Sequence, residues 1–268
     1  MGPRERIGYV VKAAQRRLFS LPDKLALITG CPRSGTTALV RWLDSNRRVY
    51  AISESRAMHA VNALVNEARR HKKLNRRRDI ITDTSIYMLS QYYYSTRFML
   101  FPDIIIDKEP LLGMSLGKDK DPARFIDNVR YVIPELKVVV LVRDPVSTLW
   151  SMTQRKWGHS IEGRDPRFIP LNDHIKVWND SSRLILDLRG DKNFYVCQFE
   201  RLCNDPEHES KRIFDFLNIN GNKIFSPRPT KTTGFNPEEI DQIHAETGEL
   251  ARALAEGGII DSSLWHRV

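Results

Sequence analysis

Apolar residues in this chain form short unbroken runs that alternate with longer amphipathic stretches. An apolar run bounded by turn-forming residues is typical of a β-strand that is covered on both faces. Such runs predict strands at residues 25–29, 49–52, 104–106, 137–142 and 193–198. The amphipathic stretches predict helices at residues 36–46, 56–75, 146–154, 174–188, 206–217 and 237–255. Because strands and helices alternate, we predict an α/β fold in three layers, with a central, mainly parallel sheet flanked by helices.

A glycine-rich turn, Gly30-Cys-Pro-Arg-Ser-Gly-Thr-Thr37, joins the first predicted strand to the first predicted helix. A turn of this kind directs backbone N–H groups toward a phosphate at the positive end of the helix dipole. Its spacing resembles the P-loop, G-x-x-x-x-G-K-[ST], but Thr36 stands at the lysine position and the cation is Arg33. Since that lysine reaches the terminal phosphates of ATP, the sequence predicts a P-loop-like domain that binds a different anion.

Two more cations stand at the ends of predicted strands, Lys108 after residues 104–106 and Arg143 after residues 137–142. Parallel strands bring their carboxyl ends to one edge of the sheet, where open α/β sheets bind ligands. Ser151 follows Arg143 by about two helical turns, so a guanidinium and a hydroxyl can hold one phosphate. The alternative for Arg143 is a structural ion pair or a capping contact. Two separate anion sites on one sheet suit a nucleotide that is phosphorylated at two positions.

Length and charge limit the function only broadly. The chain has 268 residues and a formal net charge of +9, which favours anionic partners. No domain boundary is evident after residue 23, so we predict an amphipathic segment at residues 1–23 and one domain at residues 24–268. The three cysteines form no C-x-x-C pair and no cluster with histidine, so the sequence indicates no metal site.

The N-terminal segment bears on localisation. Residues 5–20 mix apolar and basic positions, which favours a helix packed on the domain and leaves peripheral membrane contact as the alternative. No apolar run approaches the ~18 residues of a membrane span, and no signal-peptide core is present. We therefore expect a cytoplasmic protein, with membrane association through residues 5–20 or a targeting segment outside this sequence as alternatives.

Two segments taken together, Pro32–Thr37 and Arg143–Ser151, resemble the signatures of sulfotransferases that use 3′-phosphoadenosine 5′-phosphosulfate (PAPS). A third, Phe199-Glu-Arg-Leu followed by Pro206, is similar to a tyrosine-glutamate-x-leucine segment of that family, with phenylalanine in place of tyrosine. The resemblance extends over about residues 24–220. It implies PAPS as the cosubstrate and in-line transfer of its sulfuryl group to a hydroxyl or amine of an acceptor, with no metal ion required.

The resemblance also implies roles for particular residues. The first segment of the family holds the 5′-phosphosulfate, and its counterparts in this chain are Arg33, Ser34, Gly35, Thr36 and Thr37. Arg143 and Ser151 would hold the 3′-phosphate, with Phe199 also at the nucleotide. Lys231, in a basic loop near the C-terminus, would close over the cosubstrate.

The general base is open between Glu54 and Glu109. Phenol and steroid sulfotransferases use a histidine from a lysine-x-proline-histidine segment, which the stretch 107–111 lacks. Protein-tyrosine and several bacterial sulfotransferases use a glutamate after the first helix, and Ser-Glu54-Ser-Arg56 resembles that segment. We therefore expect Glu54 to be the base, Arg56 and Glu109 to lie at the acceptor, and Lys108 to contact the transferred sulfonate.

Two other functions fit parts of the sequence. A P-loop phosphotransferase would explain the glycine-rich turn but not its missing lysine. A basic protein that binds nucleic acid or another anion would use the basic block at residues 69–78. No nucleic-acid-binding motif accompanies this block, so we do not expect the chain to bind nucleic acid. The aromatic stretch 82–101 suits either an acceptor pocket or the core. Carbohydrate, lipid, peptide and metabolite acceptors remain open, and no feature selects an oligomeric state.

Overall fold

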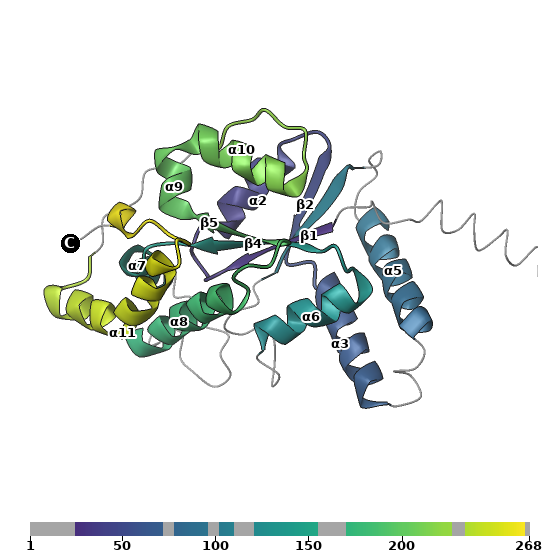
Figure 1. Cartoon of the computed structure of the whole chain (residues 1–268), viewed down its shortest axis with the longest axis horizontal. Coiled ribbons are helices and arrows are strands. Elements are labelled where there is room, and N and C mark those ends of the chain that lie inside the picture. The colour runs from purple at the N-terminus through teal and green to yellow at the C-terminus, as the bar shows by residue number, and fades with distance from the viewer. Residues whose placement is uncertain are drawn as a thin grey trace, which may run out of the picture.

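The computed structural model describes residues 25–71, 78–95, 102–109, 121–154, 170–226 and 234–265. Within these ranges a 5-stranded parallel sheet has the order β2-β3-β1-β4-β5 (Figure 1). The strands are β1 (Leu25–Gly30), β2 (Val49–Ser53), β3 (Ile104–Lys108), β4 (Lys137–Val142) and β5 (Phe194–Gln198). The first of the described strands, β1, therefore lies at the centre, between β3 and β4.

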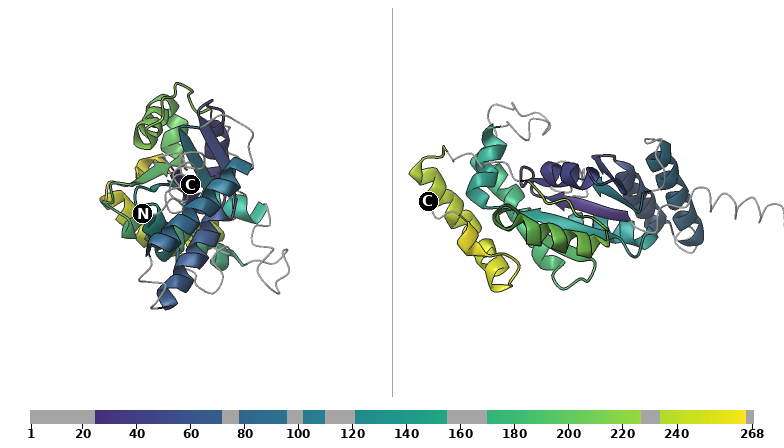
Figure 2. Two further views of the ribbon diagram at one scale, coloured as in Figure 1. Left: turned by 90° about the vertical axis from the view of Figure 1, so that its right-hand side faces the viewer. Right: turned by 90° about the horizontal axis from the view of Figure 1, so that it is seen from above.

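Helices cover both faces of this sheet. They are α2 (Thr36–Asp44), α3 (Ala57–Arg70), α5 (Arg78–Ser95), α6 (Pro122–Val132), α7 (Pro145–Gln154), α8 (Leu171–Asp187), α9 (Phe199–Asn204), α10 (Pro206–Leu217) and α11 (Pro237–Glu256), with a short 3-10 helix η1 (Ser262–Leu264). Helices α2 and α10 lie on one face, and α3, α6 and α8 lie on the other (Figure 1). Helices α5 and α11 lie at opposite ends of the described part (Figure 2). The predicted three-layer α/β fold is confirmed.

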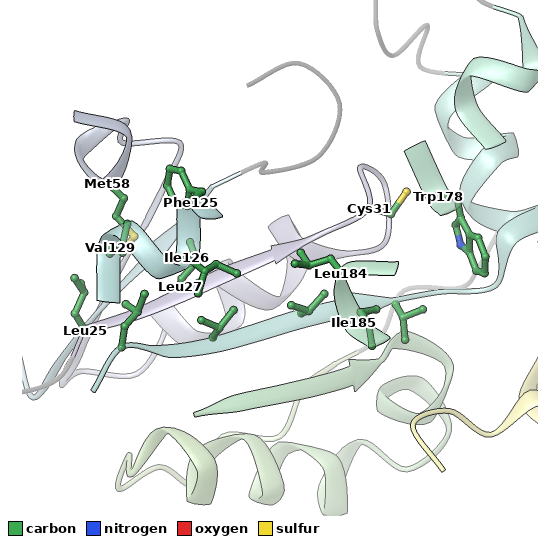
Figure 3. Packing of buried hydrophobic residues seen from close by; sticks show 14 of the residues in the cluster. Leu25, Leu27, Cys31, Met58, Phe125, Ile126, Val129, Trp178, Leu184 and Ile185 are labelled. Atoms are coloured by element: carbon green, nitrogen blue, oxygen red, sulfur yellow. The ribbon is translucent and has the colours of Figure 1, made fainter. Parts of the chain in front are cut away.

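The central strand shows why the apolar runs are continuous. Leu25 and Leu27 pack with residues of α3, α6 and α8, some of which Figure 3 shows, whereas Ala26 and Ile28 pack with α2 and α10. Because side chains alternate between the faces of a strand, both faces need apolar residues when both are covered. Each fully buried leucine or isoleucine contributes about 1.5–3 kcal/mol, so this sheet is a rigid support for groups at its edge.

The hydrophobic pattern did not predict three helices. In α5, the helix's own apolar residues are spread around its whole circumference instead of forming one stripe, so the sequence shows no helical period. Helix α6 had a readable start, since Asp121 caps the Arg124 N–H and Pro122 occupies the first turn. The short helix α9 directly continues β5 and has no pattern of its own.

Several sequence predictions fall outside the described residues. These are the N-terminal segment 1–23 with its stretch 5–20, residues 72–77 of the basic block, and Lys231. The helix predicted at residues 56–75 ends, as described, at Arg70. Among the helices of the described ranges, none has the length and apolarity to cross a membrane.

Candidate active site

The sheet register brings the predicted site residues to one edge. Lys108, the last residue of β3, is paired with Ile28 of β1 and Ser53 of β2, so Glu54 comes next to it. On the other side of β1, Val142 of β4 is paired with Gln198 of β5, so Arg143 and Phe199 are neighbours. The loop after Gly30 lies between these two pairs. The carboxyl ends of all five strands therefore contribute to one site.

The glycine-rich loop is packed tightly against its surroundings. Gly30 and Gly35 have φ angles of 151° and 107°. A Cβ atom on Gly35 would lie 2.5 Å from Cδ2 of Phe199, and one on Gly30 would lie 2.5 Å from the carbonyl oxygen of Leu141. Only glycine fits these approaches, and the packing of Phe199 against Gly35 places the β5 end beside the loop.

The start of α2 fits a phosphate group. Gly35 occupies the N-cap position and no side chain caps the helix, so its first N–H groups point out of the helix without an intrahelical acceptor. The buried Ser34 hydroxyl has no hydrogen-bond partner among the described residues. Thr36 is buried and Thr37 is exposed at the same helix start. These donors, with the helix dipole, form a cradle for an anion.

The first prediction concerns the packing of Gly35 against the Phe199 ring. Gly35→Ala should lower the free energy of unfolding by about 1–3 kcal/mol, because the new methyl group overlaps the Phe199 ring at a strained φ angle. Gly248→Ala is the control, since Gly248 lies inside α11 with nothing within 4 Å of a Cβ atom, and it should gain up to about 1 kcal/mol. Urea unfolding measures both. Equal effects in the two variants would contradict the packing.

The two segments predicted to bind phosphate groups contact each other. Nε of Arg33 donates a hydrogen bond to Oγ of Ser151 at 3.2 Å, and a guanidinium nitrogen of Arg143 donates to the carbonyl oxygen of Arg33, also at 3.2 Å. The Arg143 guanidinium stacks over the ring of Phe199, 4.9 Å from its centroid. Burial lowers the pKa of Arg143, and the nearby Glu200 and Asp144 raise it, but an arginine stays cationic at any ordinary pH. Residues that are remote in sequence thus form one cationic cluster.

A second cluster lies on the other side of the loop. Oε1 of Glu54 is 2.8 Å from Nζ of Lys108, which also donates to Oγ1 of Thr37 at 3.4 Å. The Glu54 N–H donates to the carbonyl oxygen of Lys108 at 2.7 Å. The side chain of Glu54 is 50% exposed, whereas that of Lys108 is 10% exposed. An accessible carboxylate is therefore fixed beside an enclosed ammonium group at the helix start.

The turn that carries Glu54 is fixed from beneath. Glu54 and Arg56 both have left-handed φ angles, 58° and 63°, which cost energy in residues other than glycine. Oε1 of the fully buried Glu109 accepts the Arg56 N–H at 2.7 Å, and Nε2 of His59 is 3.3 Å from the other oxygen. The Ser55 hydroxyl donates to Asp107 and accepts the Ala57 N–H at 3.0 Å. The interior carboxylates thus hold the strained turn in place.

Asp107 gives the second prediction. Its carboxylate accepts hydrogen bonds from Ser55 and, at 2.7 Å, from the hydroxyl of Tyr93. Burial, together with the neighbouring Glu109, raises the pKa of Asp107 to about 6. Because this folded-state pKa is above the unfolded value of about 3.9, the stability that Asp107 contributes is fully present below pH 4 and is lost as the pH rises through 6.

Urea unfolding between pH 4 and 7 tests this. The wild type should lose on the order of 2–3 kcal/mol relative to Asp107→Asn over that range, since an amide does not titrate. Two stability profiles that run parallel would contradict the assignment.

The aromatic stretch divides between core and surface. Tyr93 is buried against Asp107, whereas Tyr87 is 57% exposed on α5. Sequence reasoning missed His59 and Asp107. Asp107 had a signal, because it directly precedes Lys108 at a strand end, but His59 had none.

No metal centre emerges from the described ranges, where no three histidine, cysteine, aspartate or glutamate side chains gather into a group that can hold a metal ion. The cysteines in this part, Cys31, Cys197 and Cys203, are unpaired. Burial raises the pKa of the Cys203 thiol to about 11, so it is not a reactive thiolate.

Comparison with known proteins identifies the family. The model of the family described as "Sulfotransferase family" matches residues 26–222. Because this span is well over half of the 268 residues, the chain belongs to the sulfotransferase family.

Individual relatives agree. The chain is 26% identical over 208 residues to protein-tyrosine sulfotransferase A of Caenorhabditis elegans, covering 75% of this chain and 51% of the relative. It is also 26% identical over 206 residues to protein-tyrosine sulfotransferase 1 of Danio rerio, covering 75% and 55%. The chain thus spans about half the length of these curated relatives.

Solved structures show the same fold. A sulfotransferase from Alicyclobacillus acidocaldarius superposes with a TM-score of 0.60 at 15% identity, covering 91% of this chain and 99% of that one. A mouse sulfotransferase in complex with PAP superposes with a TM-score of 0.52 at 14% identity, covering 91% and 90%.

Proposed function

We propose that this chain is a PAPS-dependent sulfotransferase that transfers the sulfuryl group to a hydroxyl or amine of an acceptor. One observation carries the proposal. Two anion-binding groups that are far apart in sequence, the loop at Arg33 and the pair of Arg143 and Ser151, lie side by side at one sheet edge and contact each other. Adenosine 3′,5′-bisphosphate (PAP), the product expected from PAPS, carries two phosphate groups that match this pair of sites.

The residues divide the binding between them. The backbone N–H groups at the start of α2, with the hydroxyls of Ser34, Thr36 and Thr37, suit the 5′-phosphosulfate. Arg143 and Ser151 suit the 3′-phosphate, with Phe199 supporting the guanidinium. Lys231 lies outside the described residues, and its closure over the nucleotide remains a prediction from the sequence. None of these roles requires a metal ion.

PAPS supplies the sulfuryl group as a substrate. The acceptor oxygen or nitrogen forms a bond to sulfur as the bond between sulfur and the bridging phosphate oxygen breaks, and PAP leaves with that electron pair. The acceptor proton passes to Glu54, the proposed general base. Lys108 and Arg33 stabilise negative charge that develops on the sulfonate and bridging oxygens.

Glu54 is favoured over Glu109 as the base by exposure and contacts. Glu54 is half exposed and lies beside Lys108, so an acceptor can reach its carboxylate. Glu109 is fully buried, and its Oε1 is occupied by the Arg56 N–H. We assign Glu109 to holding the turn, while the exposed Arg56 side chain contacts the acceptor.

The names of the relatives suggest which acceptor to assay first. The matched relatives are named protein-tyrosine sulfotransferases, so a peptidyl tyrosine hydroxyl is the leading candidate. A panel with labelled PAPS should include a tyrosyl peptide, a carbohydrate, a lipid and a small phenol. The physiological acceptor class should be the one to which sulfuryl transfer is fastest, and that transfer should be lost when Glu54 is replaced.

A P-loop phosphotransferase is the rival function, because the loop spacing is shared. Calorimetry with PAP and with ATP separates the two. We expect PAP to bind in the micromolar range and more tightly than ATP, because of these two nucleotides only PAP carries a 3′-phosphate for Arg143 and Ser151 to bind. A preference for ATP, or no binding of either nucleotide, would overturn the proposed function.

A further inference from the structure

The peptide bond between Arg143 and Asp144 is held from both sides by side chains. Its carbonyl oxygen accepts a hydrogen bond from Nε1 of Trp178 at 3.0 Å, and its N–H donates to Oε1 of Glu200 at 2.9 Å. This peptide follows the last β4 residue in the ladder with β5, Val142, so the sheet no longer fixes it. At Arg143, hydrogen bonds with two side chains therefore take the place of the hydrogen bonds of the β-ladder.

Glu200 is itself held by the C-terminal part of the chain. Its second oxygen, Oε2, accepts a hydrogen bond from Nε1 of Trp265 at 3.1 Å. The ring of Trp265 packs edge-on against Trp178, with centroids 6.0 Å apart. Burial raises the pKa of Glu200 to about 7. The two tryptophans and the carboxylate form a closed set of contacts around the Arg143–Asp144 peptide.

The segment that carries Trp265 is fastened separately. The fully buried amide of Gln198 donates to the carbonyl oxygen of Asp261 and accepts the Asp261 N–H, both at 2.8 Å. The Asp261 side chain then accepts the N–H of Ser263 at 3.0 Å and fixes the start of η1. Gln198 is the last residue of β5, so the C-terminal segment 261–265 is fixed to the same strand end that carries Phe199 and Glu200.

We infer that Glu200 and Trp265 are positioning residues for Arg143, and that the C-terminal segment 261–265 thereby sets the affinity for the 3′-phosphate. The inference rests on the proposed role of Arg143 in nucleotide binding. A rotation of the Arg143–Asp144 peptide would displace the guanidinium from the Arg33 carbonyl oxygen and from the Phe199 ring. A bidentate contact with a phosphate tolerates little displacement. Trp265 lies outside residues 26–222 matched by the family model, so the motifs alone do not point to it.

Trp265→Phe tests the inference because it keeps an aromatic ring and removes the N–H group. The matched control is Trp42→Phe. Trp42 and Trp265 are similarly enclosed, at 9% and 8% exposed. Nε1 of Trp42 donates to the carbonyl oxygen of Lys223. Trp42 packs in the hydrophobic cluster with residues of α2 and α10, on the other face of the sheet. Both variants lose one enclosed hydrogen bond, but only one of them loses it beside Arg143. Glu200→Gln is a second variant. An amide has only one oxygen, so glutamine cannot accept hydrogen bonds from both the Asp144 N–H and Trp265.

The readout compares calorimetric affinities for PAP and for adenosine 5′-phosphosulfate, which lacks the 3′-phosphate. Trp265→Phe and Glu200→Gln should each weaken PAP by about fivefold or more, the size of one lost hydrogen bond, and leave adenosine 5′-phosphosulfate unchanged. Trp42→Phe should leave both affinities unchanged. Thermal unfolding and circular dichroism confirm that each variant is folded.

Two results would overturn the inference. One is an unchanged PAP affinity in Trp265→Phe, and the other is an equal loss for both nucleotides, which would indicate general loosening of the fold. Failure of the proposed function is distinct, because the wild type itself would then show no preference for PAP over adenosine 5′-phosphosulfate.

Discussion

Replacing Glu54 with glutamine should lower the turnover of sulfuryl transfer by about 100-fold or more. The amide has the shape of the carboxylate and still accepts a hydrogen bond from Lys108, which lies 2.8 Å away in the wild type. It cannot accept the proton that the acceptor must release. Because Glu54 contributes nothing to the 3′-phosphate cluster at Arg143, the calorimetric affinity for PAP should stay unchanged.

A matched control removes an equivalent carboxylate away from the site. Glu67 is half exposed on α3, where it contacts Arg70 and His71. Glu67→Gln should therefore leave both turnover and PAP affinity unchanged. Turnover is measured with labelled PAPS at saturating acceptor. Wild-type turnover in Glu54→Gln, with a loss in a folded Glu109→Gln variant, would move the role of base to Glu109.

The fold was readable from the sequence where one local pattern decides the structure. The run at residues 137–142 has to be a strand covered on both faces, and the glycines of the loop require a sharp turn before α2. Helix α5 was not readable, because its apolar residues surround it and the packing that selects a helix comes from outside the segment. Strand order is also a matter of packing, and no local feature places β3 between β2 and β1.

The candidate site, like the fold, was readable from the sequence only in part. Lys108 ends β3, Arg143 follows β4 and Arg33 lies in the turn after β1, so their place at the sheet edge follows from the parallel arrangement alone. The contacts that hold them depend on register and on distant segments. Phe199 lies against Gly35 because β5 is next to β4, and Trp265 reaches Glu200 from the end of the chain. A single sequence contains no signal for such pairs until the strands are arranged.

The direct contact between the two segments proposed to bind phosphate bears on how a nucleotide would bind. Nε of Arg33 donates to Ser151, the residue proposed for the 3′-phosphate, although Arg33 belongs to the 5′-phosphosulfate loop. The Ser151 oxygen is the acceptor in this bond, so the Ser151 O–H can still donate to a 3′-phosphate while Arg33 stays in place. The contact therefore holds the two segments together in an arrangement that suits a ligand engaging both of them.

Arg143→Ala should weaken PAP binding by about 100-fold or more, because a guanidinium can donate two charge-assisted hydrogen bonds worth about 1.5–3 kcal/mol each. Affinity for adenosine 5′-phosphosulfate should change much less, since that ligand lacks the 3′-phosphate that Arg143 is proposed to bind. Arg143→Lys keeps the charge but loses the planar fork and the stacking on Phe199, so it should fall between the alanine variant and the wild type.

Arg183→Ala is the control for the loss of one positive charge. Arg183 is 60% exposed on α8, where it pairs with Asp180, and its removal should alter neither affinity beyond the small effect of net charge. Calorimetry at two salt concentrations separates that effect, because a long-range contribution weakens with salt whereas a direct contact persists. If a folded Arg143→Ala variant bound PAP as tightly as the wild type, the 3′-phosphate would have to be held elsewhere. The roles proposed for Ser151, Glu200 and Trp265 would then fail with it.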